Sequence, residues 1–220
     1  LQKYPSGRWR PEAEYLMGVS TFRLKRYKEA VDQFKSFWRR YPKHPLEESS
    51  RYALAWSLVS LGQYSEGRKA FEDILLAYPG TKLSDPIFWG IVRTYLGGDE
   101  VERAVFLYQR FLSQFLSSPW VEQSLFDIGQ YYFSKKEYSN AATTFRQFLS
   151  TYPESELREW VHFMLGESLF NQKDYPGAIA AYHQVLEEKG RGRLESQVFS
   201  KLGYAHFYLK NYEVAIQFWE

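Results

Sequence analysis

The residues that could carry chemistry in this chain are few, and their spacing forms no catalytic or metal-binding motif. Zinc enzymes place two histidines and a glutamate close together, as in His-Glu-x-x-His. The histidines here stand in no such spacing, at His44, His162, His183 and His206. We therefore expect them to be ordinary packed or exposed residues, and we predict no metal site, no cofactor and no catalytic residue.

Gly190-Arg191-Gly192 resembles a phosphate-binding loop only superficially. It lacks the Gly-Lys-Ser/Thr ending of such loops and follows a predicted helix rather than a strand. A turn between two helices explains it more simply. No Gly-x-Ser-x-Gly is present, and acidic residues are spread along predicted helix surfaces. The sequence predicts a protein that is not an enzyme.

The amino-acid composition further limits the class of protein to which this chain can belong. The chain has 220 residues, 45% of them hydrophobic, with a net charge of +2 and no cysteine. So small a net charge argues against the clustered basic surface that binds DNA or RNA. The lack of cysteine fits the periplasm of a Gram-negative bacterium, and it fits a cytoplasmic protein too. No stretch approaches the roughly 18 apolar residues of a membrane span, so we predict no direct membrane insertion.

An internal repeat of 37 residues organises the whole chain. Four columns keep this register over six copies without an insertion. A mostly small column is Gly18, Ala55, Val92, Gly129, Gly166 and Gly203. A mostly tyrosine column is Tyr27, Tyr64, Val101, Tyr138, Tyr175 and Tyr212. A second small column is Ala30, Gly67, Ala104, Ala141, Ala178 and Ala215. An aromatic column is Phe34, Phe71, Tyr108, Phe145, Tyr182 and Trp219.

Each copy is predicted to form two helices. In the fourth copy, apolar residues recur at helical spacing on both sides of the polar turn at 134–137. The second helix is expected to end at Tyr152-Pro153, because proline lacks a backbone N–H and disfavours helical geometry in the residue before it. Asp85-Pro86 and Ser118-Pro119 suit a helix N-cap followed by the first helical residue.

Stacking of hairpins is the expected source of stability, because one hairpin cannot bury both of its apolar faces. We expect small residues where two helices cross closely and aromatic residues in the gaps between hairpins. The third copy departs from the columns at Val92 and Val101, so we expect it to be the least regular. The predicted domain is a single array with repeats at about 9–45, 46–82, 83–119, 120–156, 157–192 and 193–220. We expect it to be a fragment of a longer array.

These columns resemble the tetratricopeptide repeat (TPR). That family has an apolar residue beside a small one in the first helix, then an aromatic, a small residue, another aromatic and a closing proline. The pattern appears in the fourth copy as Ile128-Gly129, Tyr132, Ala141, Phe145 and Pro153. The resemblance implies an all-α fold, a right-handed α-α superhelical solenoid of about six hairpins, and a scaffold function in protein–protein interaction.

Tyr152-Pro153-Glu154-Ser155, followed by a first helix, is similar to bacterial envelope members of that family. Among these are the lipoprotein of the outer-membrane β-barrel assembly machine and the periplasmic protein that accompanies the Tol–Pal system. This likeness implies a periplasmic or outer-membrane-associated protein. A cytoplasmic location is the alternative.

In TPR proteins the first helices line a concave groove that takes a peptide or protein partner. Carried onto this chain, the resemblance assigns the groove to Tyr15, Tyr52, Trp56, Trp89, Arg93, Phe126, Gln130, Trp160, Phe163 and Glu167. Aromatic residues with arginine are typical of binding hot spots. The rings at Tyr15, Tyr52 and their equivalents could equally pack against a neighbouring helix. The Lys, Asn and Arg clamp with which cochaperone members bind a C-terminal carboxylate is absent.

Two other functions stay open. The first is a structural spacer that associates with itself through its outermost hairpins. The second is helical-repeat RNA binding, in which each repeat reads one base and a basic groove is needed. Arg93 is nearly alone as a basic residue among the groove positions, so nucleic acid is not a predicted partner.

Overall fold

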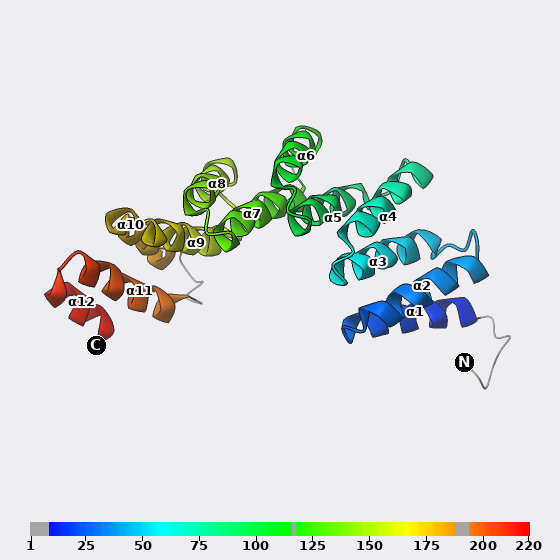
Figure 1. The fold of residues 1–220 in the computed structure, drawn as a ribbon, viewed down its shortest axis with the longest axis horizontal. Coiled ribbons are helices and arrows are strands. Elements are labelled where there is room, and N and C mark those ends of the chain that lie inside the picture. Colours follow the sequence, from blue (N-terminus) through cyan, green and yellow to red (C-terminus); the bar gives the residue numbers. More distant parts are fainter. Residues whose placement is uncertain (1–8, 116–117, 188–193) are drawn as a thin grey trace. The chain divides into compact units, whose positions relative to one another are not determined.

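The computed structural model describes residues 9–115, 118–187 and 194–220, and all the regular secondary structure in these ranges is α-helical. Figure 1 labels the helices along the chain. Their bounds are α1 Arg10–Arg23, α2 Tyr27–Arg40, α3 Glu47–Ser60, α4 Tyr64–Ala77, α5 Ser84–Gly97, α6 Val101–Gln114, α7 Pro119–Ser134, α8 Tyr138–Thr151, α9 Arg158–Asn171, α10 Tyr175–Glu187, α11 Glu195–Tyr208 and α12 Tyr212–Trp219. The predicted all-α helical-repeat fold is confirmed.

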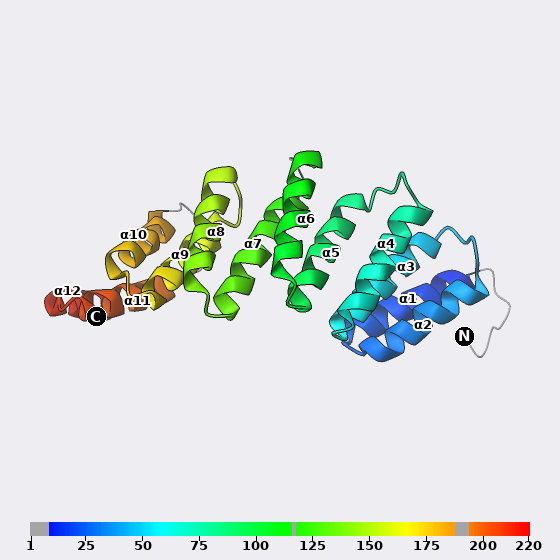
Figure 2. The ribbon, with the colours of Figure 1, turned by 45° about the horizontal axis from the view of Figure 1, so that its top comes forward.

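The chain divides into two compact units, one up to Val121 and one from Glu122 onward. In the first unit α1–α2, α3–α4 and α5–α6 form helical hairpins, and α2 packs on α3 as α4 packs on α5. In the second unit α9–α10 and α11–α12 form hairpins, with α8 packed on α9 and α10 on α11. Figure 2 shows the paired helices side by side within each unit. The single array expected from the repeat stays a prediction.

Every hairpin turn has one residue in the left-handed backbone region, and these residues are again 37 apart. They are Lys25, Gly62, Asp99, Lys136, Lys173 and Lys210, with φ between 59° and 78°. The N–H of each turn residue is bonded to a carbonyl near the end of the first helix, as in Lys136 to Phe133 at 2.9 Å. The same closed turn thus reverses the chain in all six copies.

The small and aromatic columns pack against each other inside each hairpin. A Cβ added to Gly166 would lie 2.5 Å from Cε1 of Tyr182, and one added to Gly129 would lie 2.5 Å from Cε1 of Phe145. The expected packing of the aromatic column between hairpins is also present, since Phe34 packs with Leu54 and Phe71 with Ile91 of the next hairpin. In the four copies with glycine in the small column, the aromatic ring also occupies the space that the glycine leaves on its own first helix.

Helix ends follow the proline rule only in part. Tyr152, before Pro153, is non-helical with φ −125° and ends α8 as predicted. Ser118 acts as expected at the start of α7, where its Oγ accepts a hydrogen bond from the N–H of Trp120 at 3.3 Å. Asp85 is not an N-cap, because α5 begins one residue earlier at Ser84 and Leu83 holds the cap position.

The third copy is as regular as its neighbours. Its helices α5 and α6 have 14 residues each, like α3 and α4, and Asp99 takes the common turn geometry. The expected irregularity of this hairpin was wrong, since valine in the small column is accommodated with Val92 fully buried. The predicted turn at Gly190-Arg191-Gly192 lies outside the described residues.

Candidate protein-binding surface

Three tryptophans from successive first helices pack on one another in the first unit with their rings tilted, and we call them the tryptophan ladder. Trp56 lies on α3, Trp89 on α5 and Trp120 in the first turn of α7. The ring centroids of Trp56 and Trp89 are 5.0 Å apart, and those of Trp89 and Trp120 are 4.6 Å apart. All three rings are half-buried. The ladder is therefore a continuous aromatic surface that solvent still reaches.

Arg93 and Tyr52 extend this surface. The guanidinium of Arg93 lies 5.3 Å from the ring centroid of Trp89 and 5.9 Å from that of Trp56, within cation–π range. Tyr52 meets Trp56 edge-on at 6.2 Å, and burial raises the pKa of its phenol although a hydrogen bond with Trp56 opposes the rise. The structure thus brings together the predicted residues Tyr52, Trp56, Trp89 and Arg93.

Trp120 was not among the predicted site residues. It stands just before the first apolar position of its helix, where the first copy has Trp9 and the remaining copies have Leu46, Leu83, Leu157 and Leu194. That column indicates core packing. The one signal that could have singled out Trp120 is the larger aromatic residue at a leucine position. Tyr15, in contrast, packs on Phe34 and Phe37 of its own hairpin.

In the second unit the predicted residues divide between core and surface. Phe126 and Phe163 are each 9% exposed. Phe126 packs on Phe145 and Phe148, and Phe163 packs on Tyr182. Trp160 is 41% exposed and meets Phe163 edge-on at 6.3 Å. Gln130 is exposed on α7. Trp160 and Gln130 are thus the more accessible of these positions.

Glu167 joins three helices of the second unit. One carboxylate oxygen accepts a hydrogen bond from the Tyr182 hydroxyl on α10 at 2.5 Å, and the other pairs with Lys201 Nζ on α11 at 2.6 Å. Burial and the nearby Glu167 charge raise the pKa of Tyr182 far above its ordinary value. This carboxylate therefore already ties α9 to its own hairpin and to the next one.

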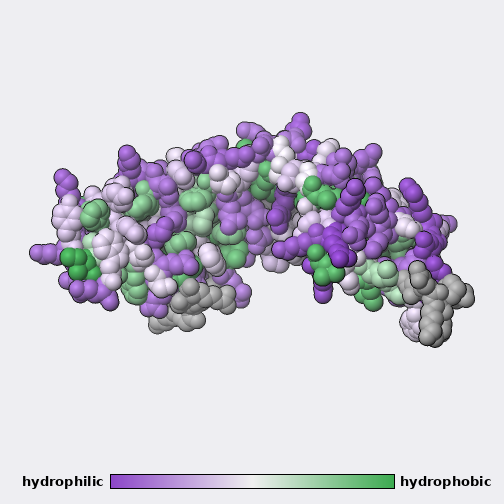
Figure 3. Space-filling view, turned by 60° about the horizontal axis from the view of Figure 1, so that its bottom comes forward, coloured by the Kyte–Doolittle hydropathy of each residue, from purple (hydrophilic) through white to green (hydrophobic). Residues whose placement is uncertain are grey.

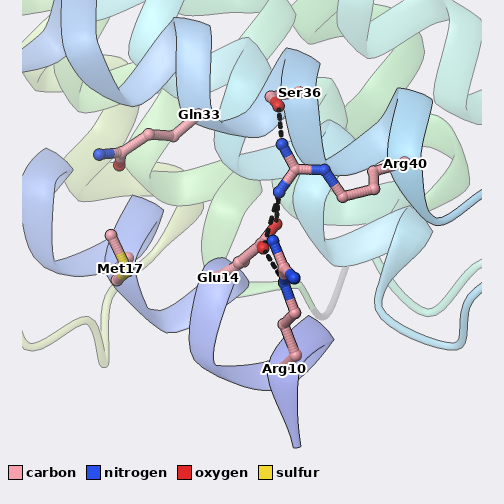
Figure 4. Close-up of a pocket in the computed structure, with 6 residues that line it drawn as sticks. All are labelled: Arg10, Glu14, Met17, Gln33, Ser36 and Arg40. Atoms are coloured by element: carbon pink, nitrogen blue, oxygen red, sulfur yellow. Dashed lines mark hydrogen bonds and ion pairs between the residues drawn. The ribbon is translucent and has the colours of Figure 1, made fainter. Parts of the chain in front are cut away.

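A shallow pocket of about 290 Å³ lies between α1 and α2, lined by Arg10, Glu14, Met17, Gln33, Ser36 and Arg40. Figure 4 shows both guanidinium groups turned toward the Glu14 carboxylate. Arg40 Nη1 lies 2.6 and 2.7 Å from the two oxygens, and Arg10 Nε lies 2.8 Å from one of them. Burial alone would raise the pKa of Glu14, but its hydrogen bonds to Arg10 and Arg40 outweigh this and lower it. The Glu14 carboxylate is therefore paired with both guanidinium groups, and the lining residues of the pocket have a net charge of +1.

The described residues offer no obvious catalytic arrangement. They contain no group of three or more His, Cys, Asp or Glu side chains that could hold a metal ion. Nor does any helix in the described ranges have the length and apolar character to span a membrane. On the face that Figure 3 shows, hydrophobic residues form separate patches among hydrophilic ones.

Stacked 37-residue hairpins with half-exposed rings on their first helices define a helical-repeat protein, and sequence comparison supports the TPR type. A tetratricopeptide-repeat family model matches residues 163–219. The YfiO model, described as an outer membrane lipoprotein, matches residues 89–180, and the model for subunit 3 of the anaphase-promoting complex, or cyclosome, matches residues 2–74. No curated protein matches the chain in sequence.

Solved structures with the same fold include bacterial proteins. A TPR protein from Parabacteroides merdae is 16% identical, with a TM-score of 0.61 over 94% of this chain and 77% of that one. The Pseudomonas aeruginosa protein pilF is 12% identical, with a TM-score of 0.61 over 94% and 88%. MamA from Desulfovibrio magneticus is 15% identical, with a TM-score of 0.57 over 80% and 93%. At these identities the likeness concerns the fold.

Proposed function

We propose that the chain is a protein–protein interaction scaffold that binds a protein or peptide partner through the tryptophan ladder and the adjacent Arg93. The observation that carries the proposal is the row of three half-buried tryptophans in mutual contact on successive first helices. An isolated hairpin does not need such rings at its surface, and their partial exposure costs solvation free energy that a partner would recover. The scaffold has no catalytic role in this proposal and needs no cofactor.

The chemistry of the surface defines the kind of partner. Tryptophan and arginine dominate binding hot spots, because they combine a large apolar area with polar groups at the edge. The centroids of neighbouring ladder rings are 5.0 and 4.6 Å apart, which leaves no room for a ligand side chain between them. A ligand would therefore contact the outer faces and edges of the rings. An apolar segment that contains aromatic residues fits this surface, as does the flank of another folded domain.

A bacterial envelope complex is the setting that we propose for this scaffold. The support is the match of residues 89–180 to the outer membrane lipoprotein model, a range that includes Trp89, Arg93 and Trp120. The Tyr-Pro loops similar to envelope members of the family agree with it. A periplasmic or outer-membrane-associated location follows from the proposal. A cytoplasmic scaffold with the same ladder is the alternative.

A pull-down with paired variants tests the ladder. The wild-type chain, the Trp56→Ala/Arg93→Ala variant and a Phe106→Ala control are immobilised and exposed separately to envelope and soluble bacterial fractions. Phe106 is 62% exposed on the second helix α6, so its loss leaves the ladder intact. We expect a partner from the envelope fraction to be retained by wild type and control, with affinity at least about tenfold weaker for the double variant.

Other outcomes of that experiment would count against the proposal. A partner retained equally by all three proteins moves binding away from the ladder. A partner found only in the soluble fraction removes the envelope setting but keeps the scaffold. Because Trp56 packs on Phe71 at 5.3 Å, the melting temperature of each variant is measured, and Arg93→Glu serves as a variant that leaves this packing in place. Retention of single-stranded RNA that weakens with salt would favour the nucleic-acid alternative.

A further inference from the structure

Three successive hairpin turns of the second unit repeat the same set of side chains. Each has a phenylalanine one residue before the end of the first helix, a lysine at the left-handed turn position and a tyrosine as the first residue of the second helix. The sets are Phe133, Lys136 and Tyr138, then Phe170, Lys173 and Tyr175, then Phe207, Lys210 and Tyr212. We call these three turns the lysine–tyrosine edge.

Local contacts hold each set together. The N–H of each turn lysine donates a hydrogen bond to the carbonyl of the phenylalanine three residues earlier, at 2.9 Å in all three turns. The centroids of the phenylalanine and tyrosine rings of one set are 5.3 or 5.4 Å apart. The rings of Phe133, Tyr138, Phe170 and Tyr175 are half-buried, so part of each ring reaches the surface beside a lysine.

Contacts between neighbouring hairpins place the three turns along one edge of the unit. Gln172 Nε2 in the α9–α10 turn donates a hydrogen bond to the carbonyl of Tyr138 at 3.0 Å. Tyr175 stacks on Tyr208 of the next first helix at 5.1 Å and 7°. Tyr208 is 54% exposed. Its equivalents in the other hairpins are exposed too, at Arg23, Ser60, Gly97, Ser134 and Asn171. This exposure therefore belongs to the same position in every hairpin.

The acidic residues next to the lysines are bonded to the second helices. Asp174 Oδ1 accepts a hydrogen bond from the N–H of Gly177 at 3.0 Å. Glu137 Oε2 accepts one from Asn140 Nδ2 at 2.8 Å. All three turn lysines are exposed. Their ammonium groups are therefore accessible to a ligand outside the chain.

Folding does not require lysine at this position. Gly62 and Asp99 take the same left-handed geometry in the α3–α4 and α5–α6 turns. In the first unit the α1–α2 turn has the full set, at Phe22, Lys25 and Tyr27, and the two turns that follow it do not. A row of three such turns in succession is therefore a feature of the second unit.

We propose that the lysine–tyrosine edge binds the surface of an anionic phospholipid bilayer. Tyrosine is favoured at the level of the lipid headgroups, because its ring is apolar and its hydroxyl is polar. A lysine stem lies along apolar surface while its ammonium reaches a phosphate. In this contact the turns touch the headgroups, and no helix enters the hydrocarbon core. The edge lies in the second unit and the tryptophan ladder in the first, so this proposal does not depend on the scaffold function.

The arrangement of the charges favours a bilayer over an acidic peptide. Each turn presents its lysine beside a ring pair, so the charges form a row and do not surround a single carboxylate. Sites that recognise one carboxylate commonly use the forked guanidinium of arginine. The three turns, at 134–138, 171–175 and 208–212, contain no arginine. A plane of lipid phosphates can meet all three lysines at once.

Cosedimentation with vesicles tests the proposal. The full chain is mixed at low salt with vesicles of phosphatidylglycerol and phosphatidylcholine, or of phosphatidylcholine alone. We expect binding to the anionic vesicles only, and its loss at about 0.5 M salt, because salt screens exposed charges. The Lys136→Gln/Lys173→Gln/Lys210→Gln variant should bind about a hundredfold more weakly, at about fivefold for each lysine.

A second triple variant controls for net charge. Lys28→Gln/Lys35→Gln/Lys69→Gln removes the same charge from exposed lysines of α2 and α4, and it should bind nearly as wild type does. Tyr208→Ser tests the contribution of the rings, with a serine that Ser60 and Ser134 already provide at the equivalent position. We expect this variant to bind about threefold to tenfold more weakly. The melting temperature of each variant is measured, because Tyr208 packs on Tyr175.

Four results would overturn the proposal. The first is a wild-type chain that does not sediment with the anionic vesicles. The second is equal binding to both kinds of vesicle, which would leave the lysines without a role. The third is equal weakening by the two lysine variants, which would assign the binding to net charge. The fourth is a hexaglutamate peptide that binds the edge as tightly as the vesicles do, which would replace the bilayer with an acidic protein partner.

Discussion

At the scale of single residues, the most regular feature is the turn residue with left-handed backbone geometry, which is present in every hairpin. Five of the six are residues with a Cβ, which pay a steric cost in this backbone region. Lysine occupies four of the positions, with φ between 61° and 65°. These side chains are exposed. The positive φ of the backbone, rather than side-chain packing, therefore decides which residues suit the position.

Substitution of Lys136 tests whether the positive φ restricts the residue at this position. Valine at φ 62° adds branching at Cβ to an already strained conformation, so Lys136→Val should lower the free energy of unfolding by about 1–2 kcal/mol. Glycine adopts this conformation freely, and its gain is offset by its greater freedom in the unfolded chain, so Lys136→Gly should be within about 1 kcal/mol of wild type. Urea denaturation of both variants measures the difference. Equal stability of the two would mean that the turn tolerates any residue.

At the scale of elements, a side chain in the preceding loop accepts a hydrogen bond at the start of each of the helices α3, α5, α7 and α9. His44 Nδ1, Thr81 Oγ1, Ser118 Oγ and Ser155 Oγ each accept a hydrogen bond from the N–H two residues later, at 2.9–3.3 Å. These residues are spaced by 37, like the columns of the core. The loop acceptor therefore fixes where the next helix starts.

Removing one of these acceptors should loosen a helix start. Ser155 is buried, and Ser155→Ala leaves the Leu157 N–H without its partner at 3.0 Å, so we expect a loss of about 1–3 kcal/mol. Ser155→Thr should retain most of the stability, because Thr81 serves at the equivalent position. Ser139→Ala, at an exposed position on α8, is the control for the loss of a hydroxyl. Thermal unfolding that ranks Ser155→Ala with the control would contradict the role of this hydrogen bond at the start of α9.

The repeat made the fold predictable, and the limits of the prediction have physical causes. The position of each hairpin followed from small and aromatic columns, because burial requires the same residue sizes in every copy. The left-handed lysines could not be predicted, since lysine has no preference for that region and the sequence shows only a polar turn. Trp120 was missed because a leucine column indicates core. The burial of Phe126 and Phe163 depends on ring orientation, which spacing does not define.

At the scale of the whole molecule, the described hairpins of each unit pack on the next one along the chain, as α2 packs on α3 and α10 on α11, so stability within a unit is distributed over several hairpins. A local change should therefore open the hairpin that it touches and leave distant ones closed. The last hairpins contain a titratable pair suited to showing this. His206 on α11 stacks on Phe218 of α12 at 5.6 Å, and His183 on α10 lies 6.4 Å from the same ring.

Acidification should open α11 and α12 before the first unit responds. Burial and the nearby His183 lower the pKa of His206 from its ordinary value of 6.5, so the folded state favours the neutral imidazole. The resulting stability is fully present above pH 6.5 and is lost as the pH falls below it, because the unfolded chain then binds the proton more readily. Between about pH 7.5 and about pH 5.5, hydrogen exchange corrected for intrinsic rates should show lost protection in α11 and α12 and none in α1–α6. His206→Gln should remove this pH dependence, and His183→Gln should reduce it. Protection lost evenly in both units would mean that the hairpins open as one cooperative body.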